Sequence, residues 1–466
     1  MPIKPLAVNE LPKALPFKKL LGPSFIILGL GLGSGEMILW PYLTSNYGMG
    51  IIWAAILGIT FQFFMNMEIE RYALARGESV FVGLKRKFKF LPAWFLLSTF
   101  IPWIWPGITA ASATLFGYIL GIERTDLLAI GFLVAMGIVL TLGPILYKTV
   151  ETLQKILISL GVPSIFLLSI FLSSKTDWSH LAAGVLGMGD GFFLLPENLP
   201  LASFLAALAY AGAGGNLNLA QSFYIKEKGY GMGKYAGRIT SLFTGKSENI
   251  SLSGTRFEIN KQNLQNFKAW WKAINLEHFT VFWLTGSITI LLLGLLAFST
   301  TYGMEGNTAS INFVINEAAQ ISSKIFPFAG VFFLLIAGST LFGTQLTVFD
   351  ATSRILSENA IFAAPSKLNE KHLPRVYYLV LWLQIFAGIT VFLFGFTEPL
   401  QLLILAAVLN AFAMFIHTGL ILWLNNTSLE KPLRPSIFRF IVMTLAFLFY
   451  GGFSLYVIFD KFFSAA

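Results

Sequence analysis

The fold of this chain is decided by two glycine-rich stretches, Gly29-Leu30-Gly31-Leu32-Gly33-Ser34-Gly35-Glu36 and Ala211-Gly212-Ala213-Gly214-Gly215-Asn216-Leu217-Asn218. Each lies in the middle of an apolar segment long enough to cross a bilayer. A Gly weakens a helix by about 1 kcal/mol relative to Ala, so such clusters predict local unwinding. Unwound backbone at membrane depth is tolerated only where it is buried in protein or lines a wet cavity. We therefore expect two broken membrane helices, with breaks at Gly31 and Gly35 in one and at Gly212, Gly214 and Gly215 in the other.

The composition around these stretches is that of a membrane protein. Of 466 residues, 56% are apolar and 12% are charged, and the mean hydropathy is +0.72. A soluble chain this apolar could not cover its own surface, so lipid must be the solvent for most of it. The chain has no Cys, which excludes disulfide frameworks, thiolate metal sites and thiol nucleophiles. The sequence predicts an all-α integral membrane protein whose partner is the lipid bilayer, with no nucleic acid bound.

Eleven apolar segments are long enough to span the membrane, allowing about 20 residues each. The two glycine-rich segments are the first and the sixth, so five spans separate them and they run in opposite directions. Two five-span repeats of inverted topology produce this pattern, with the binding site at their interface. The expected divisions are a cytoplasmic segment 1–21, a first repeat 22–173, an extracellular loop 174–200, a second repeat 201–424 with a cytoplasmic loop 225–276, and an extra eleventh helix 437–459.

The basic residues predict the orientation. Of the 32 Lys and Arg residues, 28 fall on the side of the N-terminus and four on the other side. Because cytoplasmic loops carry the excess of Lys and Arg, the N-terminus is expected inside and the C-terminus outside. The net charge of +9 is thereby explained by topology, and a multi-pass protein of the plasma membrane is expected.

Glu36 is the one carboxylate in the middle of any expected span. A charged side chain at that depth costs roughly 3 kcal/mol on insertion scales, so it normally faces a cavity and has a partner. A functional interpretation makes it the charged ligand of a transported cation. The alternative is a protonated Glu36, or one that is hydrogen-bonded to backbone groups, with a purely structural role.

Several stretches resemble the natural resistance-associated macrophage protein (Nramp) metal transporters, of the amino acid–polyamine–organocation superfamily. The run from Gly22-Pro23-Ser24-Phe25 through Tyr47-Gly48 is similar to their first span, Asn216-Leu217-Asn218-Leu219 to part of their sixth, and Ala337-Gly338-Ser339-Thr340-Leu341-Phe342-Gly343-Thr344 to their eighth. The resemblance implies a LeuT-type fold of ten core helices plus an extra C-terminal helix, and transport by alternating access.

The resemblance also implies a ligand set, from which the chain departs. The family's first-span Asp and Asn fall on Gly33 and Glu36, and its sixth-span Met falls on Ala213. Loss of the soft Met ligand favours a hard cation such as magnesium or manganese. Glu36 would supply charge, and neutral oxygens would come from the carbonyl groups near Leu30, Tyr210 and Ala213 and from the side chains of Asn216 and Asn410. The family's proton-relay acids are missing, because span three has no carboxylate between Pro92 and Gly121.

Three functions remain open at this point. The first is a secondary transporter of a hard divalent cation, which is then its substrate, with no cofactor and without the usual proton relay. The second is a transporter of a small organic solute such as an amino acid, because exposed half-helix N-termini can hold a carboxylate and Glu36 an ammonium group. The third, a membrane enzyme or sensor, is disfavoured, because the sequence has no nucleophile–base constellation, metal-ligand cluster or phosphate loop.

Overall fold

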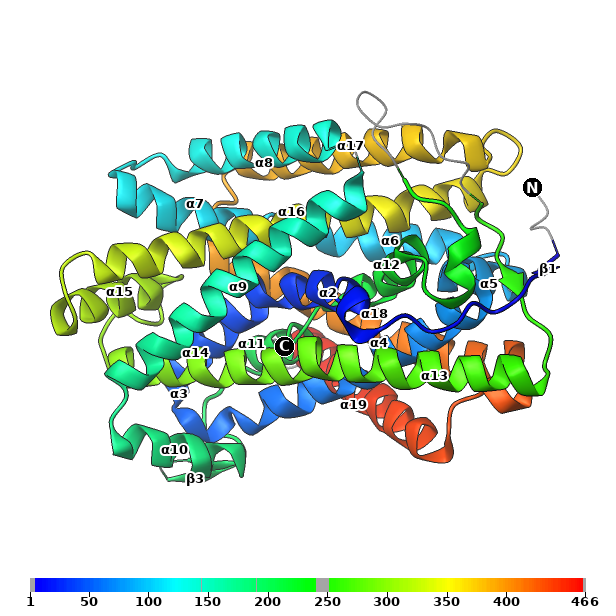
Figure 1. The fold of residues 1–466 in the computed structure, drawn as a ribbon. Coiled ribbons are helices and arrows are strands. Elements are labelled where there is room, and N and C mark those ends of the chain that lie inside the picture. The colour runs from blue at the N-terminus through cyan, green and yellow to red at the C-terminus, as the bar shows by residue number, and fades with distance from the viewer. Residues whose placement is uncertain (1–4, 144, 190, 240–250, 464–466) are drawn as a thin grey trace.

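Long helices lying side by side make up the protein in the computed structural model, which describes residues 5–143, 145–189, 191–239 and 251–463 (Figure 1). Ten helices of this described part are long and apolar enough to cross a membrane. The expected sixth span is divided into pieces too short to be among these ten. With it, the number of spans is the predicted eleven. The prediction of an all-α membrane protein is confirmed.

The first five spans follow one another with short connections. Span one has three continuous parts, and span three is interrupted after its first half. The elements are α2 (Pro23–Gly31), η1 (Leu32–Leu39) and α3 (Trp40–Tyr47) for span one; η2 (Met49–Ile51) and α4 (Trp53–Arg76) for span two; α6 (Leu91–Trp103) and α7 (Gly107–Leu120) for span three; α8 (Thr125–Leu142) for span four; and α9 (Leu146–Leu172) for span five.

The second set of spans begins with the divided span six. Span seven is one unbroken helix that begins at Lys261, so the expected loop 225–276 contains its first 16 residues. The elements are α11 (Leu201–Ala209), η3 (Gly215–Ala220) and α12 (Gln221–Lys228) for span six; α13 (Lys261–His278), η5 (Phe279–Leu284) and α14 (Thr285–Thr301) for span seven; α16 (Ala329–Ala363) for span eight; α17 (Leu373–Leu393) for span nine; α18 (Pro399–Ser428) for span ten; and α19 (Ile437–Phe463) for span eleven.

Short elements connect the spans. Strand β1 (Ala7–Val8) pairs in parallel with β4 (Thr255–Arg256), and β2 (Met188–Gly189) pairs antiparallel with β3 (Phe192–Phe193). The remaining pieces are α1 (Phe17–Leu20), α5 (Val80–Lys87), α10 (Lys175–Val185), η4 (Gly231–Tyr235), α15 (Asn312–Lys324), η6 (Glu370–His372) and η7 (Lys431–Leu433).

Local sequence explains where several helices begin. Pro23 and Pro399 occupy the first turn of α2 and α18, where a missing N–H costs nothing. The Glu398 carboxylate accepts the backbone N–H groups of Leu400 and Gln401, so it caps α18 and also complements the positive end of the helix dipole.

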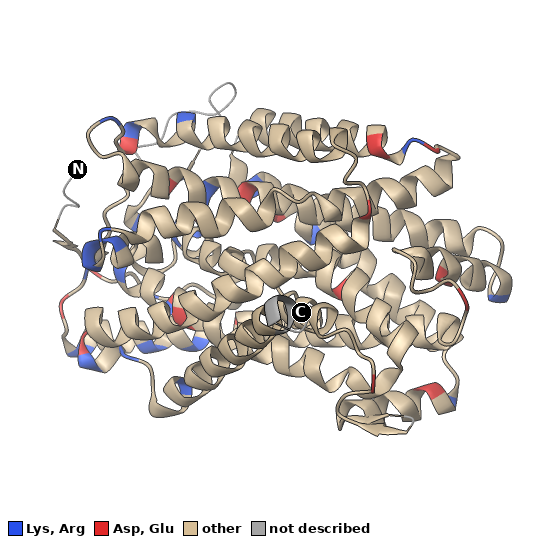
Figure 2. Cartoon of the chain, turned by 180° about the vertical axis from the view of Figure 1, so that it is seen from behind, with Lys and Arg blue, Asp and Glu red and all other residues tan. Residues whose placement is uncertain are grey.

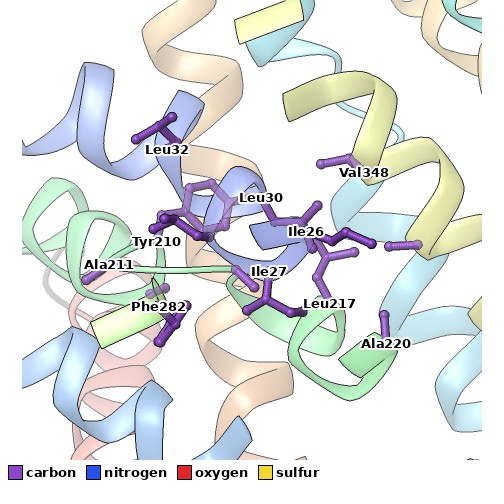
Figure 3. Packing of buried hydrophobic residues seen from close by; sticks show 14 of the residues in the cluster. Ile26, Ile27, Leu30, Leu32, Tyr210, Ala211, Leu217, Ala220, Phe282 and Val348 are labelled. Atoms are coloured by element: carbon purple, nitrogen blue, oxygen red, sulfur yellow. The ribbon is translucent and has the colours of Figure 1, made fainter. Parts of the chain in front are cut away.

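Span one lies at the centre of the bundle. The 18-residue stretch of highest hydropathy in span one is completely buried, whereas only 22% of the corresponding stretch of span five is buried. In Figure 3 its side chains Ile27 and Leu30 pack among residues of span six, and Val348 of span eight lies nearby. Lys and Arg gather at the end of the bundle that holds the N-terminus (Figure 2), here called the N-terminal end. A site on span one is therefore enclosed by other spans instead of facing lipid.

Candidate functional site

The glycine-rich part of span one remains helical. Leu32–Leu39 forms a π-helical segment in which the N–H of Trp40 bonds to the carbonyl of Gly35. The predicted break at Gly31 and Gly35 is therefore wrong. The wider π turn keeps the backbone hydrogen-bonded, and the Thr344 hydroxyl of span eight donates to the Gly29 carbonyl at 2.7 Å. Such π turns are frequent at functional sites.

These glycines instead allow close contact with neighbouring spans. A Cβ at Gly31 would lie 2.6 Å from the Gly212 carbonyl oxygen, and one at Gly35 would overlap the carbonyl of Tyr210. Gly33 is equally close to Thr344. Small residues let membrane helices approach backbone to backbone. The two glycine-rich stretches therefore lie side by side, as the inverted repeat predicts.

The predicted break in span six is confirmed. Helix α11 ends at Ala209 and no regular helix covers the residues up to Gly214. Gly212, Gly214 and Gly215 have φ values of +130°, +71° and +54°, a region that residues with a Cβ rarely adopt. The non-helical backbone therefore requires Gly at these positions.

A glutamine of span two bridges the two ends of this break. Gln62 Nε2 donates to the Ala209 carbonyl at 3.0 Å, and its Oε1 accepts the Gly214 N–H at 3.3 Å. One side chain thus satisfies backbone groups that unwinding leaves without helical partners. Gln62 could not be predicted for this role, because a single Gln in an expected span has no local signal.

Glu36 occupies a different face of the π segment from Gly33 and Gly35. Its Oε1 lies 3.5 Å from the position that a Cβ on Gly286 of span seven would take. The residue is fully buried, and among the described residues neither carboxylate oxygen has a hydrogen-bond partner. A buried polar group without a partner costs several kcal/mol, so this carboxylate needs a proton or a cation.

Tyr210 and Asn410 form the second part of the site. Asn410 Nδ2 donates to the Tyr210 hydroxyl at 3.0 Å, and the Tyr210 ring stacks on Trp103 with centroids 5.6 Å apart. The predicted ligand Asn216 lies on the same break and donates to Ser98 and Thr99 of span three at 2.9 and 3.0 Å. The Oδ1 atoms of Asn216 and Asn410 have no partner among the described residues, so both remain available as acceptors.

The predicted residues thus divide into two groups. Tyr210, Asn216 and Asn410 gather where spans three, six and ten meet, whereas Glu36 faces span seven. Leu30 and Ala213 are both buried on the facing stretches of spans one and six, and Leu30 lies near Tyr210 in Figure 3. Within the described residues, no three or more of His, Cys, Asp and Glu are grouped so that they could hold a metal ion.

Span three adds an interruption that the sequence analysis missed. Helix α6 ends at Trp103 and α7 begins at Gly107, which leaves 104–106 outside both. The signal was present in Pro102 and Pro106, because each Pro lacks an N–H and disfavours helix before it. The end of α6 places Trp103 against Tyr210, so the interruptions of spans three and six meet at the site.

No family model and no curated protein sequence matches this chain. Among solved structures, a variant of the Eremococcus coleocola manganese transporter matches with a TM-score of 0.69 at 13% identity, covering 98% of this chain and 90% of that one. The nucleobase-cation-symport-1 family transporter MHP1 has a TM-score of 0.52 at 13% identity, with 97% and 95% covered. MhsT in complex with L-phenylalanine has 0.52 at 15% identity, with 94% and 98% covered.

These similarities establish the fold. The chain is a multi-pass membrane protein with the LeuT-type fold of secondary transporters, as expected from its sequence. Membership of the Nramp family stays a prediction, because it depends on sequence stretches that no match tests.

Proposed function

We propose that this protein is an Nramp-like secondary transporter that works by alternating access and carries a hard divalent cation, of the magnesium or manganese type, as its substrate. One observation carries the proposal: the buried Glu36 carboxylate has no hydrogen-bond partner for either oxygen among the described residues. The π segment that carries Glu36 packs through Gly35 against the broken span six, and in this proposal the backbone carbonyl groups of the break are the further oxygen ligands. Oxygen ligands of mostly neutral character suit a hard cation that keeps several waters.

The distribution of charge supports a cytoplasmic N-terminus. Lys and Arg gather at the N-terminal end of the bundle (Figure 2), which the positive-inside rule assigns to the cytoplasm. The protein then belongs to the plasma membrane, with the C-terminus outside. No catalytic role and no cofactor form part of this proposal.

The N-terminal end of the bundle is held together by ion pairs of α12, the second half of span six. Arg354 of span eight pairs with Glu227, and Lys228 pairs with Glu151 of span five at 2.7 Å. Opening this end requires the buried Arg354–Glu227 pair and the partly exposed Lys228–Glu151 pair to separate, as an alternating-access cycle demands.

A small organic solute is the second candidate substrate. The stacked rings of Trp103 and Tyr210 and the unpartnered amide oxygens of Asn216 and Asn410 favour it. An apolar surface with a few convergent polar groups is typical of small-molecule sites. In this case Glu36 would bind an ammonium group or a coupling cation.

Uptake into proteoliposomes separates the two candidates. Magnesium, manganese, calcium and a panel of amino acids are compared for the parent, for Glu36→Gln and for Trp103→Ala. We expect saturable divalent-cation uptake that Glu36→Gln strongly reduces and Trp103→Ala largely retains. Amino acid uptake that depends on Trp103, without cation uptake, would replace the cation with an organic solute.

A further inference from the structure

A second group of buried ionisable side chains lies apart from Glu36, between spans one, two, six and seven. Ser24 Oγ is hydrogen-bonded to the Glu277 carboxylate and lies 2.7 Å from His278 Nδ1. The same Nδ1 lies 3.1 Å from Glu70 Oε1, which accepts from Gln221 Nε2 at 2.7 Å. All five side chains are fully buried. A continuous chain of hydrogen-bonding groups thus joins two carboxylates through a serine and a histidine.

The geometry of this hydrogen-bonded group allows its hydrogen atoms to be assigned. If His278 is neutral with its proton on Nδ1, that N–H faces both Glu70 and Ser24, and the Ser24 hydroxyl donates to Glu277. Glu277 also faces the backbone N–H of Gly22 at 3.4 Å. Each carboxylate then accepts from two donors, but both contacts of Glu70 are to Oε1, and its buried Oε2 has no hydrogen-bond partner among the described residues.

A positive charge on His278 is disfavoured by its surroundings. The ring is stacked against Phe63 and Phe282, with centroids 5.6 and 4.7 Å away, and its Nε2 has no partner among the described residues. A second ring proton would sit in this apolar position without an acceptor. An added proton therefore goes to a carboxylate and not to the imidazole.

The charged groups around the cluster are engaged with other partners. Arg71 and Arg439 pair with Glu68, while Lys155 and Lys228 pair with Glu151. Within the described chain, no Lys or Arg forms an ion pair with Glu70 or Glu277. The remaining titratable neighbours are the buried phenols of Tyr147 and Tyr230. Two buried carboxylates that are linked through one serine and one imidazole, and that have no direct cationic partner, compete for an added proton.

We propose that Glu70, His278, Ser24 and Glu277 form a proton-binding site that controls opening of the N-terminal end of the bundle. With both carboxylates ionised, Glu277 holds the start of α2 through Ser24, and Glu70 holds α12 through Gln221. A proton taken from water onto one carboxyl oxygen removes the negative charge of that acceptor, so the hydrogen bonds that the carboxyl group accepts become weaker. Protonation of Glu277 thus weakens the link to α2, protonation of Glu70 weakens the link to α12, and loss of the proton restores the link.

This inference goes beyond the proposed function and is independent of the substrate. It concerns residues other than Glu36 and needs only the transporter fold. Its test is made without any substrate, so failure of this proposal and failure of the cation proposal are distinguishable.

The absence of Cys from the chain permits a single-cysteine accessibility test. Ser222→Cys is the reporter, because Ser222 is fully buried on α12 and its Oγ faces the N–H of Val80 at 3.4 Å. Maleimide labelling is measured in liposomes between about pH 5.5 and about pH 8 and corrected with the exposed Ser323→Cys. We expect the corrected rate to increase as pH falls, by up to about tenfold per pH unit for one bound proton.

Three variants in the reporter background decide the outcome. Glu277→Gln and Glu70→Gln each imitate a protonated carboxyl group, one at each end of the hydrogen-bonded group. Labelling of the reporter cysteine should therefore be fast and independent of pH in both variants. Glu317→Gln removes a buried carboxylate outside this cluster and should retain the pH dependence of the parent. A flat profile in the parent, or a parental profile in a folded Glu70→Gln or Glu277→Gln protein, would overturn the proposal.

Discussion

Replacing Glu36 by Gln is the sharpest test of the cation site. The change preserves the size and polarity of the side chain and removes only its charge. Because both carboxylate oxygens are buried and have no hydrogen-bond partner among the described residues, no existing hydrogen bond is lost. The effect on binding should therefore report the interaction between the charge and the substrate.

The magnitude follows from Coulomb's law. Two unit charges 4 Å apart interact by about 4 kcal/mol at an effective dielectric of 20, and more for a divalent ion. Waters retained on the cation reduce this, so we expect a loss of about 2 kcal/mol or more in binding free energy. That corresponds to about thirtyfold weaker binding. Folding should survive, since neutralising a buried charge at membrane depth removes an insertion cost.

The assay is calorimetric binding of magnesium and manganese to purified protein, together with liposome uptake. Glu317→Gln is the matched control, because it neutralises a second fully buried carboxylate elsewhere in the chain. The control should bind like the parent. If Glu36→Gln binds and transports every tested divalent cation like the parent, the cation site is wrong and the organic-solute function takes its place.

Three further predictions concern packing, closure and coupling. Gly35→Val should lower the free energy of unfolding by about 1–3 kcal/mol, because a Cβ at this position would overlap a span-six carbonyl. Thermal unfolding measures this change. Gly452→Val is the control and should have no effect, because a Cβ at Gly452 meets open space. Glu227→Gln deprives Arg354 of one buried partner, so labelling of the α12 cysteine reporter should rise by about tenfold or more at every pH; a parental rate would contradict this. Since span three has no acid between Pro92 and Gly121, substrate uptake should carry no stoichiometric proton flux into liposomes containing a pH-sensitive dye.

The membrane class, the number of spans and the break in span six could be predicted from the sequence. Each depends on local composition: apolar length determines which segments prefer lipid, and several Gly residues close together make a helix costly. Gly212, Gly214 and Gly215 satisfy that rule, and their positive φ values confirm it. The position of Glu36 at membrane depth follows from the same segment lengths.

Only the tertiary structure decided whether the glycine-rich part of span one stays helical and which residues each side chain contacts. The same composition that unwinds span six gives a π turn at Leu32–Leu39, because contacts with spans six and eight support a continuous helix there. The stacking of Trp103 on Tyr210 and the meeting of Glu70 with His278 join residues more than 100 positions apart. Helix rotation and long-range packing produce such contacts, and no local pattern encodes them.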